Sequence, residues 1–339
     1  MRISGVELTK ISEEQRPAYV LVLQSDSGLS GVGELTASDG SEERERSAAF
    51  IADLLIGRDP FEIEALVADA KVGADGTGPD LALMSAATSA MMDLTGQSLE
   101  VPVHQLLGGR VRERVRVCAV DWANGAKTRG ELAAAARRTA ESGYTVLRVE
   151  PFAPSLSLRA SDLQPATELV RAVRDALPNE VDLVVTADRG LSVSAIAEFA
   201  DMLTVLEPLW LEEYMPGSDG SAKTDTLPRA AGRGVDGDVL RSLATGNLVD
   251  HLVLEVGRIG GLVDARRIAA LAEVYYVGVI PVGSGSVLSL RTAMQLAAVV
   301  PNLSLVEARP GLAAVEDGTL PIDDRPGFSS TVRLSEVGS

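Results

Sequence analysis

Residues 183–211 read LVVTADRGLSVSAIAEFADMLTVLEPLWL: a short apolar run, an amphipathic segment with helical period, and a second apolar run. A strand followed by a helix and another strand is the repeating unit of parallel α/β folds. Such runs recur eight times through the last two thirds of the chain, at Val115–Val120, Val146–Val149, Leu183–Thr186, Leu209–Leu211, Arg229–Ala231, Leu252–Leu254, Val277–Pro281 and Leu303–Val306. This repetition predicts a (β/α)8 barrel, in which functional groups lie at the carboxyl ends of the strands.

Helical patterns fill most of the gaps between these runs. Thr128 with Glu131, and Ser161 with Gln164, have the spacing of a capping box and predict helices over 129–142 and 162–177. Later helices are expected at Ser192–Leu206, Gly237–Thr245, Leu262–Tyr275 and Val287–Val300. Residues 215–226, between the fourth and fifth runs, are too polar and glycine-rich for a packed helix, and a loop is predicted there.

The first 112 residues do not follow this rhythm and predict an α+β capping domain. Strand-like segments at Val6–Lys10, Ala18–Ser25 and Ser30–Leu35 are followed by helical patterns at Glu42–Ile56, Pro60–Ala70 and Leu81–Gly96. The expected division is therefore a cap over 1–112, a barrel over 113–311, and a tail over 312–339 that returns to the cap.

Composition limits the kind of partner. The 339 residues carry a formal charge of −17, which disfavours nucleic acid and anionic membrane surfaces, so a small molecule is expected. No run approaches 18 apolar residues and the first residues do not resemble a signal segment, which predicts a cytoplasmic protein. The single cysteine, Cys118, lies inside the first barrel strand and is expected to be a core residue.

Five strings then stand in a characteristic order: Leu29–Glu34 (LSGVGE), Met91–Leu94 (MMDL), Pro102–Gly109 (PVHQLLGG), Trp210–Glu213 (WLEE) and Gly257–Gly261 (GRIGG). Together they resemble the enolase superfamily, in particular its mandelate racemase and muconate lactonizing branch. The resemblance implies a cap closed over the barrel, a symmetric homo-oligomer, and a small carboxylate as ligand. It also implies removal of a proton from the carbon next to that carboxylate, with Mg2+ holding the enediolate.

The resemblance places the three Mg2+ ligands at the ends of strands three, four and five, which here are Thr186, Glu212 and Arg233. Glu212 alone among them is a carboxylate. Mg2+ requires hard oxygen ligands and a guanidinium would repel it, so we expect the metal to be absent or displaced. A displaced site that uses Asp188 and Glu213 beside Glu212 is the alternative.

The positions of the catalytic bases have also changed. Where the resemblance implies a pair of lysines after strand two, this chain has Arg148 and Glu150, and where it implies a histidine and its acid partner it has Val282 and Glu255. Arginine stays protonated and can bind a carboxylate in a two-pronged contact, whereas Glu150 can serve as a base. The catalytic candidates are Arg148, Glu150, Arg233 and Glu255.

Three residues are candidates for substrate binding. Trp122, just past strand one, is placed to wall the pocket, and Ser284 and Ser286 supply hydroxyls in a glycine-rich turn after strand seven. The polar segment 13–16 corresponds in the resemblance to a lid over the substrate.

Two hypotheses remain open. In the first, the protein is a racemase, cycloisomerase or dehydratase in which Arg148 and Arg233 stabilise the developing anion without metal. In the second, these arginines neutralise Glu212 and Glu255 in an ion-pair network, and the protein is a non-catalytic descendant that binds a ligand or serves as a scaffold.

Overall fold

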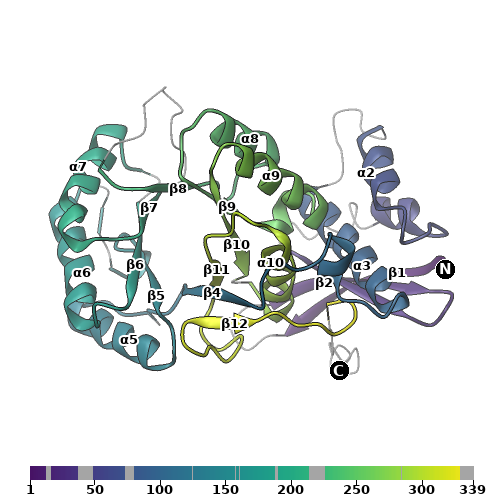
Figure 1. Ribbon diagram of the computed structural model, residues 1–339, viewed down its shortest axis with the longest axis horizontal. Helices are drawn as coiled ribbons and strands as arrows, with labels where there is room; N and C mark the ends of the chain where they lie inside the picture. Colours follow the sequence, from purple (N-terminus) through teal and green to yellow (C-terminus); the bar gives the residue numbers. More distant parts are fainter. Residues whose placement is uncertain are drawn as a thin grey trace.

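The computed structural model describes residues 1–12, 17–36, 49–72, 80–123, 125–156, 158–159, 161–187, 190–213, 226–283 and 285–328. A barrel of parallel strands lies beside an antiparallel sheet with its own helices (Figure 1). The predicted fold class, a (β/α)8-type barrel with an α+β cap, is confirmed. Within the described ranges no helix is long and apolar enough to cross a membrane.

Eight parallel strands form the barrel in chain order, and β11 pairs with β4 to close it. They are β4 (Arg114–Ala119), β5 (Val146–Val149), β6 (Asp182–Thr186), β7 (Trp210–Glu213), β8 (Arg229–Ala231), β9 (His251–Leu254), β10 (Gly278–Gly283) and β11 (Val306–Ala308). The predicted loop between β7 and β8 falls almost wholly on residues 214–225, outside the described residues.

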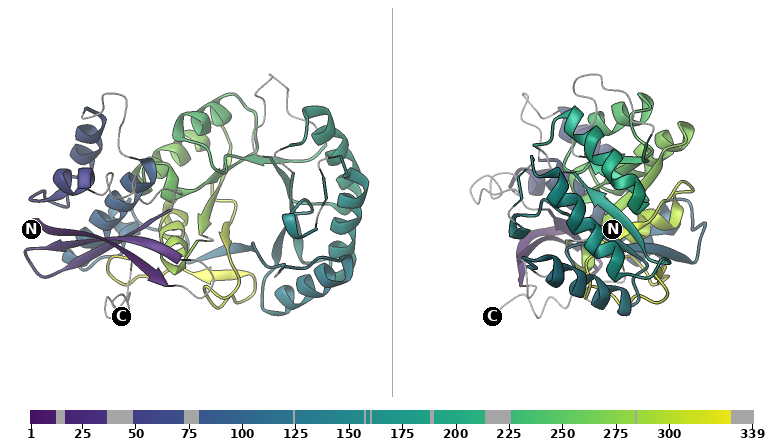
Figure 2. Two further views of the ribbon diagram at one scale, coloured as in Figure 1. Left: turned by 180° about the vertical axis from the view of Figure 1, so that it is seen from behind. Right: turned by 90° about the vertical axis from the view of Figure 1, so that its left-hand side faces the viewer.

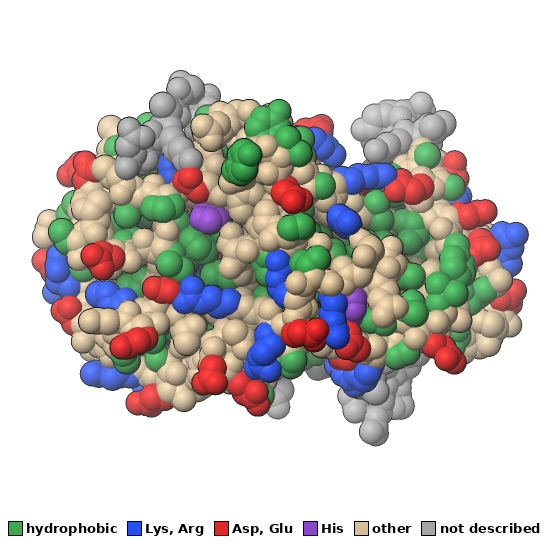
Figure 3. All heavy atoms as spheres, in the orientation of Figure 1, with side chains coloured by type: hydrophobic (Ala, Val, Ile, Leu, Met, Phe, Trp, Pro, Cys, Tyr) green, Lys and Arg blue, Asp and Glu red, His purple; other side chains and the backbone are tan. Residues whose placement is uncertain are grey.

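Helices cover the outside of the barrel, and α5, α6 and α7 form the rim farthest from the cap (Figures 1 and 2). The barrel helices are α5 (Arg129–Glu141), α6 (Leu163–Ala176), α7 (Val193–Leu203), α8 (Gly237–Thr245), α9 (Leu262–Val274) and α10 (Val287–Val299). Single 3-10 turns occur at η1 (Pro154–Leu156), η2 (Thr204–Leu206) and η3 (Val256–Arg258). Lys and Arg are interspersed with Asp and Glu over the face shown in Figure 3.

The inside of the barrel is built in layers. One buried apolar layer contains Cys118, Val146, Val184, Trp210, Ala230, Val253, Ile280 and Leu305. Alternate residues of a strand share a face, so the residues two positions further along also face the interior, nearer the carboxyl ends of the strands. On β5, β6, β7 and β11 these are Arg148, Thr186, Glu212 and Glu307, all of them buried. A polar layer therefore lies directly above the apolar core.

The cap combines a three-stranded sheet with helices. Its strands are β1 (Ile3–Ser12), β2 (Pro17–Ser25) and β3 (Ser30–Leu35), and its helices are α2 (Ile63–Val72), α3 (Leu81–Ser98) and the short α4 (Val103–Leu106). Helix α3 lies directly on β3, where a Cβ atom at Gly33 would stand 1.9 Å from the carbonyl oxygen of Ala86. Glycine is needed there because any side chain would force the helix off the sheet.

The end of the chain ties the two parts together. Strand β12 (Thr319–Pro321) pairs antiparallel with β4 of the barrel. Further on, the backbone N–H of Phe328 donates to Asp93 Oδ1 at 2.8 Å, while the N–H of Val32 donates to Asp93 Oδ2 at 3.0 Å. Asp93 lies on α3 and is fully buried, so one carboxylate joins β3, α3 and the tail.

One of the two predicted capping boxes forms. The Thr128 hydroxyl accepts from the N–H of Glu131, whose carboxylate accepts in return from the N–H of Thr128. At α6 the capping residue is Asp162, which makes no side-chain cap, and the Ser161 hydroxyl donates to the Asp162 carboxylate at 3.3 Å. The box predicted from Ser161 is therefore absent, because α6 begins at Leu163 and Ser161 lies one residue before the capping position.

One cap helix begins at the predicted residue and one begins later: α3 starts at Leu81 as expected, whereas α2 starts three residues after Pro60. Pro60 lies in a turn and α2 starts at Ile63, because the N–H of Phe61 donates to Asp59 Oδ1 at 3.2 Å and holds a tight turn there. Of the helix predicted over Glu42–Ile56, residues 49–55 are helical, and residues 42–48 lie outside the described residues. The expected lid at 13–16 also lies outside them.

Candidate functional site

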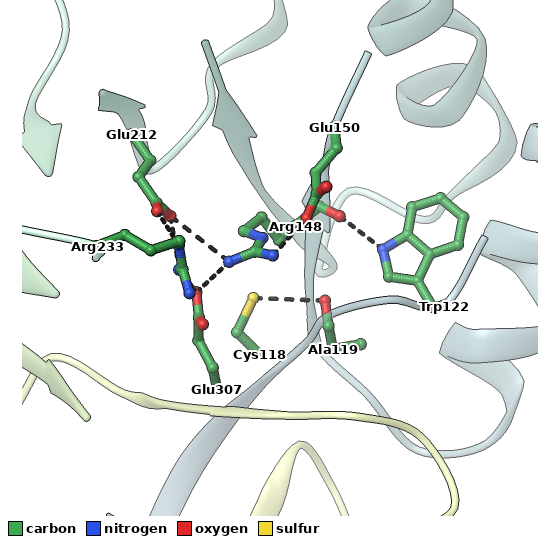
Figure 4. A network of polar contacts seen from close by, with 8 residues as sticks. All are labelled: Cys118, Ala119, Trp122, Arg148, Glu150, Glu212, Arg233 and Glu307. Carbon is green, nitrogen blue, oxygen red and sulfur yellow. Dashed lines mark hydrogen bonds and ion pairs between the residues drawn. The ribbon is translucent and has the colours of Figure 1, made fainter. Parts of the chain in front are cut away.

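Arg148 stands among three carboxylates in the polar layer (Figure 4). Its Nη1 donates to Glu307 Oε1 at 2.9 Å and lies 3.8 Å from Glu212 Oε2, and its Nη2 donates to Glu150 Oε1. The Arg148 side chain is 8% exposed, and those of Glu212 and Glu307 are 2% and 3% exposed. Glu150, with 38% of its side chain exposed, is the outermost of the three acids.

Arg233 approaches two of these carboxylates, Glu212 and Glu307, from the end of β8. Its Nε donates to Glu212 Oε1 at 2.5 Å, and its Nη2 donates to Glu212 Oε2 at 3.1 Å and to Glu307 Oε1 at 2.7 Å. The preceding residue, Gly232, has a φ of 120° and leaves no room for a Cβ, which would lie 2.5 Å from Leu240 Cδ2. We call Arg148, Glu150, Glu212, Arg233 and Glu307 the mouth network.

Charges in the mouth network stabilise one another. Burial alone would raise the pKa of the Glu307 carboxyl, but Arg148 and Arg233 outweigh it and hold that pKa below its usual value. Burial likewise opposes the charge on both arginines, yet the neighbouring glutamates hold the pKa of each above its ordinary value. Both arginines are therefore charged at neutral pH and unsuited to act as bases. Beneath them, burial raises the pKa of Cys118, so its thiol stays neutral.

The polar layer does not offer Mg2+ a set of oxygen ligands. At the three positions implied by the resemblance, Thr186 Oγ1 is buried without a hydrogen-bond partner, and the guanidinium of Arg233 binds both oxygens of Glu212. Among the described residues there is no group of three His, Cys, Asp or Glu side chains that could hold a metal. Glu212 is the one carboxylate among the three implied positions, and a cation already binds it, so these three residues do not fit Mg2+, which needs several hard oxygen ligands.

The proposed displaced metal site does not assemble in the described residues. Glu213 follows Glu212 on β7 and points to the opposite face of the strand. Its carboxylate accepts from Arg229 Nε at 2.6 Å and also from Nη2 of the same arginine on β8. Asp188 lies outside the described residues. Glu212 is thus the one candidate ligand that the structure places in the polar layer.

Glu255 does not join the mouth network. Its Oε2 lies 3.4 Å from Nε of Arg258, three residues along, and its side chain is 22% exposed. The hypothesis that Arg148 and Arg233 neutralise Glu212 and Glu255 is therefore wrong in its second acid, because Glu307 takes that place.

Ser286 holds the cap to the barrel. Its hydroxyl oxygen accepts from the N–H groups of Leu288 and Ser289, at 3.0 and 3.2 Å, and caps α10. The same hydroxyl donates to Glu34 on β3 of the cap, and Ser286 is 3% exposed. The structure thus gives Ser286 partners within the protein, whereas Ser284 lies outside the described residues.

A cavity of about 300 Å3 opens beside Arg148 and Glu150. Its lining also includes Asp121, Trp122, Ala123, Gly125, Leu132, Ala153, Ser155 and Leu156. Trp122 is 3% exposed, and its indole N–H donates to the backbone oxygen of Arg148 at 2.7 Å (Figure 4). Trp122 therefore forms a fixed wall next to the mouth network, and the cavity has the size of a small-molecule site.

Sequence reasoning missed Glu307, which lies between both arginines. The eighth strand was predicted over Leu303–Val306, but the structure places it at Val306–Ala308. The alternation of inward-facing residues along the strand could have identified Glu307. Leu305 belongs to the apolar layer, and Glu307 lies two positions after it, just as Glu212 lies two positions after Trp210. Glu34, the cap residue that meets Ser286, was quoted in a string but was not proposed for the site.

A closed eight-stranded barrel covered by an α+β cap, with charged side chains at the strand ends, defines an enolase-type capped barrel protein. This chain belongs to the mandelate racemase and muconate lactonizing enzyme family of that class. Residues 5–108 match the family described as "Mandelate racemase / muconate lactonizing enzyme, N-terminal domain", and residues 131–337 match "Enolase C-terminal domain-like".

Relatives with named activities include two sugar-acid dehydratases. The chain is 31% identical to D-gluconate dehydratase of Thermoproteus tenax over 76% of its own length and 54% of the relative, so it spans about half of that protein. It is 25% identical to D-xylonate dehydratase of Haloferax volcanii over 99% of its length and 88% of the relative. A structure from Burkholderia xenovorans strain LB400, bound to magnesium and fumarate, superposes with a TM-score of 0.87 at 19% identity, covering 99% of this chain and 95% of that one. This last likeness shows the fold.

Proposed function

We propose that this protein acts on a small polyhydroxy carboxylate by removing the proton next to the carboxylate, at a site that works without Mg2+. The main observation behind this proposal is that Arg233 occupies a position at which the resemblance implies a metal ligand, and its guanidinium binds both oxygens of Glu212. The relatives named as D-gluconate and D-xylonate dehydratases support a sugar acid as the substrate class. Supporting evidence for a binding place is the cavity beside Arg148.

The substrate carboxylate would bind Arg148 by displacing Glu150. Among the carboxylates on Arg148, Glu150 is the most exposed, at 38% of its side chain against 3% for Glu307. A carboxylate on Nη2 of Arg148 keeps a charge-assisted hydrogen bond there, so the exchange preserves the charge pairing. Glu307 stays between the two arginines and keeps them in place.

Glu150, once displaced, is the base of this proposal. It takes the proton from the carbon next to the substrate carboxylate, and the electron pair of that C–H bond passes into the carboxylate as an enediolate. Arg148 then faces the developing negative charge at close range, which is the place where a fixed cation lowers the barrier most. In a dehydratase the enediolate expels the hydroxyl on the next carbon, and protonated Glu150 gives its proton to that oxygen so that water leaves. In a racemase the carbon next to the carboxylate takes up a proton again on its opposite face.

A second candidate function is a ligand-binding protein that has lost catalysis. It is favoured by the charge count of the mouth network, because both arginines already bind the network's own carboxylates. An internally paired network of this kind stabilises the fold whether or not a substrate reacts. The homo-oligomeric state and the cytoplasmic location expected from the sequence stay predictions.

The test compares metal binding and turnover in the chelator-treated protein. Titration calorimetry with Mg2+ and Mn2+ should show no binding, while a panel of sugar acids is followed for loss of the α-proton by exchange in D2O. Exchange that persists with chelator and falls at least tenfold in Glu150→Gln supports the proposal. Mg2+-dependent exchange would overturn the metal-free site, and binding without exchange would favour the second candidate.

A further inference from the structure

We infer that the cavity between the ends of β4 and β5 holds the far end of the substrate and selects a tail that is uncharged or positively charged, against a second carboxylate. This inference rests on the proposed function for the first carboxylate and adds the specificity of the same site. It predicts a preference for monocarboxylic sugar acids over dicarboxylic ones.

The cavity lining combines two chemically different groups of residues. Arg148 and Glu150 belong to the mouth network, while Asp121, Trp122 and Ser155 come from the segments that follow β4 and β5. Its volume of about 300 Å3 is at the lower end of the range for ligand pockets, which suits a six-carbon acid. A substrate carboxylate at Arg148 therefore directs the rest of its carbon chain toward Asp121, Trp122 and Ser155.

Trp122 gives this part of the cavity a rigid apolar face. Its indole N–H is occupied by the backbone oxygen of Arg148 at 2.7 Å, which fixes the ring. The flat face of a tryptophan packs against the C–H groups of a hydroxylated chain. Nearby carboxylates accept hydrogen bonds from the O–H groups of that chain, and nearby hydroxyls both accept and donate. The Ser155 hydroxyl and the Asp121 carboxylate supply such groups in the lining.

Charge decides which tail fits. Arg148 is the one cation among the described lining residues. Its guanidinium binds Glu307 and Glu150, and in the proposed complex the first substrate carboxylate replaces Glu150. A second carboxylate on the tail would enter beside Asp121 without a cation of its own, at a cost in Coulomb repulsion and in lost hydration. Hydroxyls and ammonium groups meet no such penalty.

Asp121 is held in position by the backbone. It follows the end of β4 with a φ of 56°, in the left-handed region that aspartate and asparagine adopt more readily than most residues. Asp121→Asn therefore removes the charge and keeps the backbone preference, which makes it the matched test variant. Asp175→Asn, at an exposed position on α6, is the control for loss of one negative charge elsewhere.

The experiment measures binding of D-gluconate, D-glucarate, 6-amino-6-deoxy-D-gluconate and D-glucitol by titration calorimetry. We expect the wild type to bind both gluconate and its 6-amino analogue at least about tenfold more tightly than glucarate, which is a difference in binding free energy of about 1.4 kcal/mol. Asp121→Asn should reduce the preference over glucarate at least about threefold, and Asp175→Asn should leave it unchanged. Far-UV circular dichroism verifies that both variants are folded.

The outcomes separate this inference from the proposed function. Equal affinity for gluconate and glucarate in the wild type, or a preference that Asp121→Asn does not change, overturns the inference while carboxylate binding stands. Binding of glucitol that is weakened by Asp121→Asn, without binding of any acid, supports the cavity assignment and overturns the proposed substrate class. Failure of all four probes to bind overturns both.

Discussion

Replacing Arg233 by methionine, which keeps most of the side-chain volume, tests whether the mouth network is the electrostatic centre of the barrel. The change removes the contacts at 2.5 and 3.1 Å to Glu212 and the contact at 2.7 Å to Glu307. Glu307 keeps Arg148 at 2.9 Å, but the nearest cation left to Glu212 is Arg148 at 3.8 Å. The penalty therefore falls mainly on Glu212.

Its magnitude follows from burial. The side chain of Glu212 is 2% exposed, so water cannot take over the lost contacts, and breaking a buried ion pair of this kind costs about 3–5 kcal/mol. Urea unfolding, followed by circular dichroism at pH 7.5, measures the loss. Adding Glu212→Gln to Arg233→Met removes the stranded charge and should recover about 2 kcal/mol, which a double-mutant cycle detects.

Two results would refute this reasoning. If Arg233→Met lowered the free energy of unfolding by less than about 1 kcal/mol, the Arg233–Glu212 pair would be no stronger than an exposed ion pair. The mouth network would then not be the electrostatic centre of the barrel. A double variant that is no more stable than Arg233→Met would show that the stranded carboxylate is not the source of the loss.

Three further predictions test the metal position, the cap and the pH dependence. Thr186→Asp with Arg233→Glu restores carboxylates around the polar layer and should bind Mg2+ in calorimetry, whereas unchanged absence of binding would show that the barrel mouth no longer has the required geometry. Gly33→Ala should destabilise the protein by about 3 kcal/mol or more in thermal unfolding, because the new Cβ would lie 1.9 Å from an atom of helix α3. The control is Gly130→Ala, whose Cβ would have no atom within 4 Å. This control should be neutral, or stabilising by up to about 1 kcal/mol, in the same assay. Because the pKa of Glu307 is lower in the folded protein, its ionised carboxylate stabilises the fold at pH values above its unfolded pKa of about 4.3. This stabilisation is lost as the pH falls through the folded pKa. The free energy of unfolding should therefore decrease below about pH 4, and it should decrease less in Glu307→Gln.

The barrel was predictable from the sequence because each strand and helix carries its own local pattern. The apolar run at Leu183–Thr186 and the helix after Ser192 agree closely with β6 and α7. The exact start of a helix was less predictable: Ser161 has the right spacing for a capping box, yet α6 begins at Leu163 with Asp162 as its capping residue. Spacing in the sequence does not decide which of two adjacent polar residues caps a helix.

The candidate site was predictable in part. Arg148, Glu212 and Arg233 stand out because they occupy strand ends, and the structure brings these three together. Glu307 was missed because the end of a strand is the least certain part of a strand prediction, and an error of two residues hides a whole layer. Contacts between distant segments, such as Glu34 with Ser286, require the tertiary fold.

The buried carboxylate of Asp93 has a consequence for how this protein is made. The hydrogen bonds from Val32 and Phe328 to this carboxylate join the third strand of the chain to the last described residue. A nascent chain folds from its amino end as it leaves the ribosome. The capping sheet can therefore collapse early, but the contact of Asp93 with Phe328 forms only after the last barrel strand, β11, has been synthesised. A residue that follows the whole barrel in the chain thus completes a contact of the capping domain, which precedes the barrel.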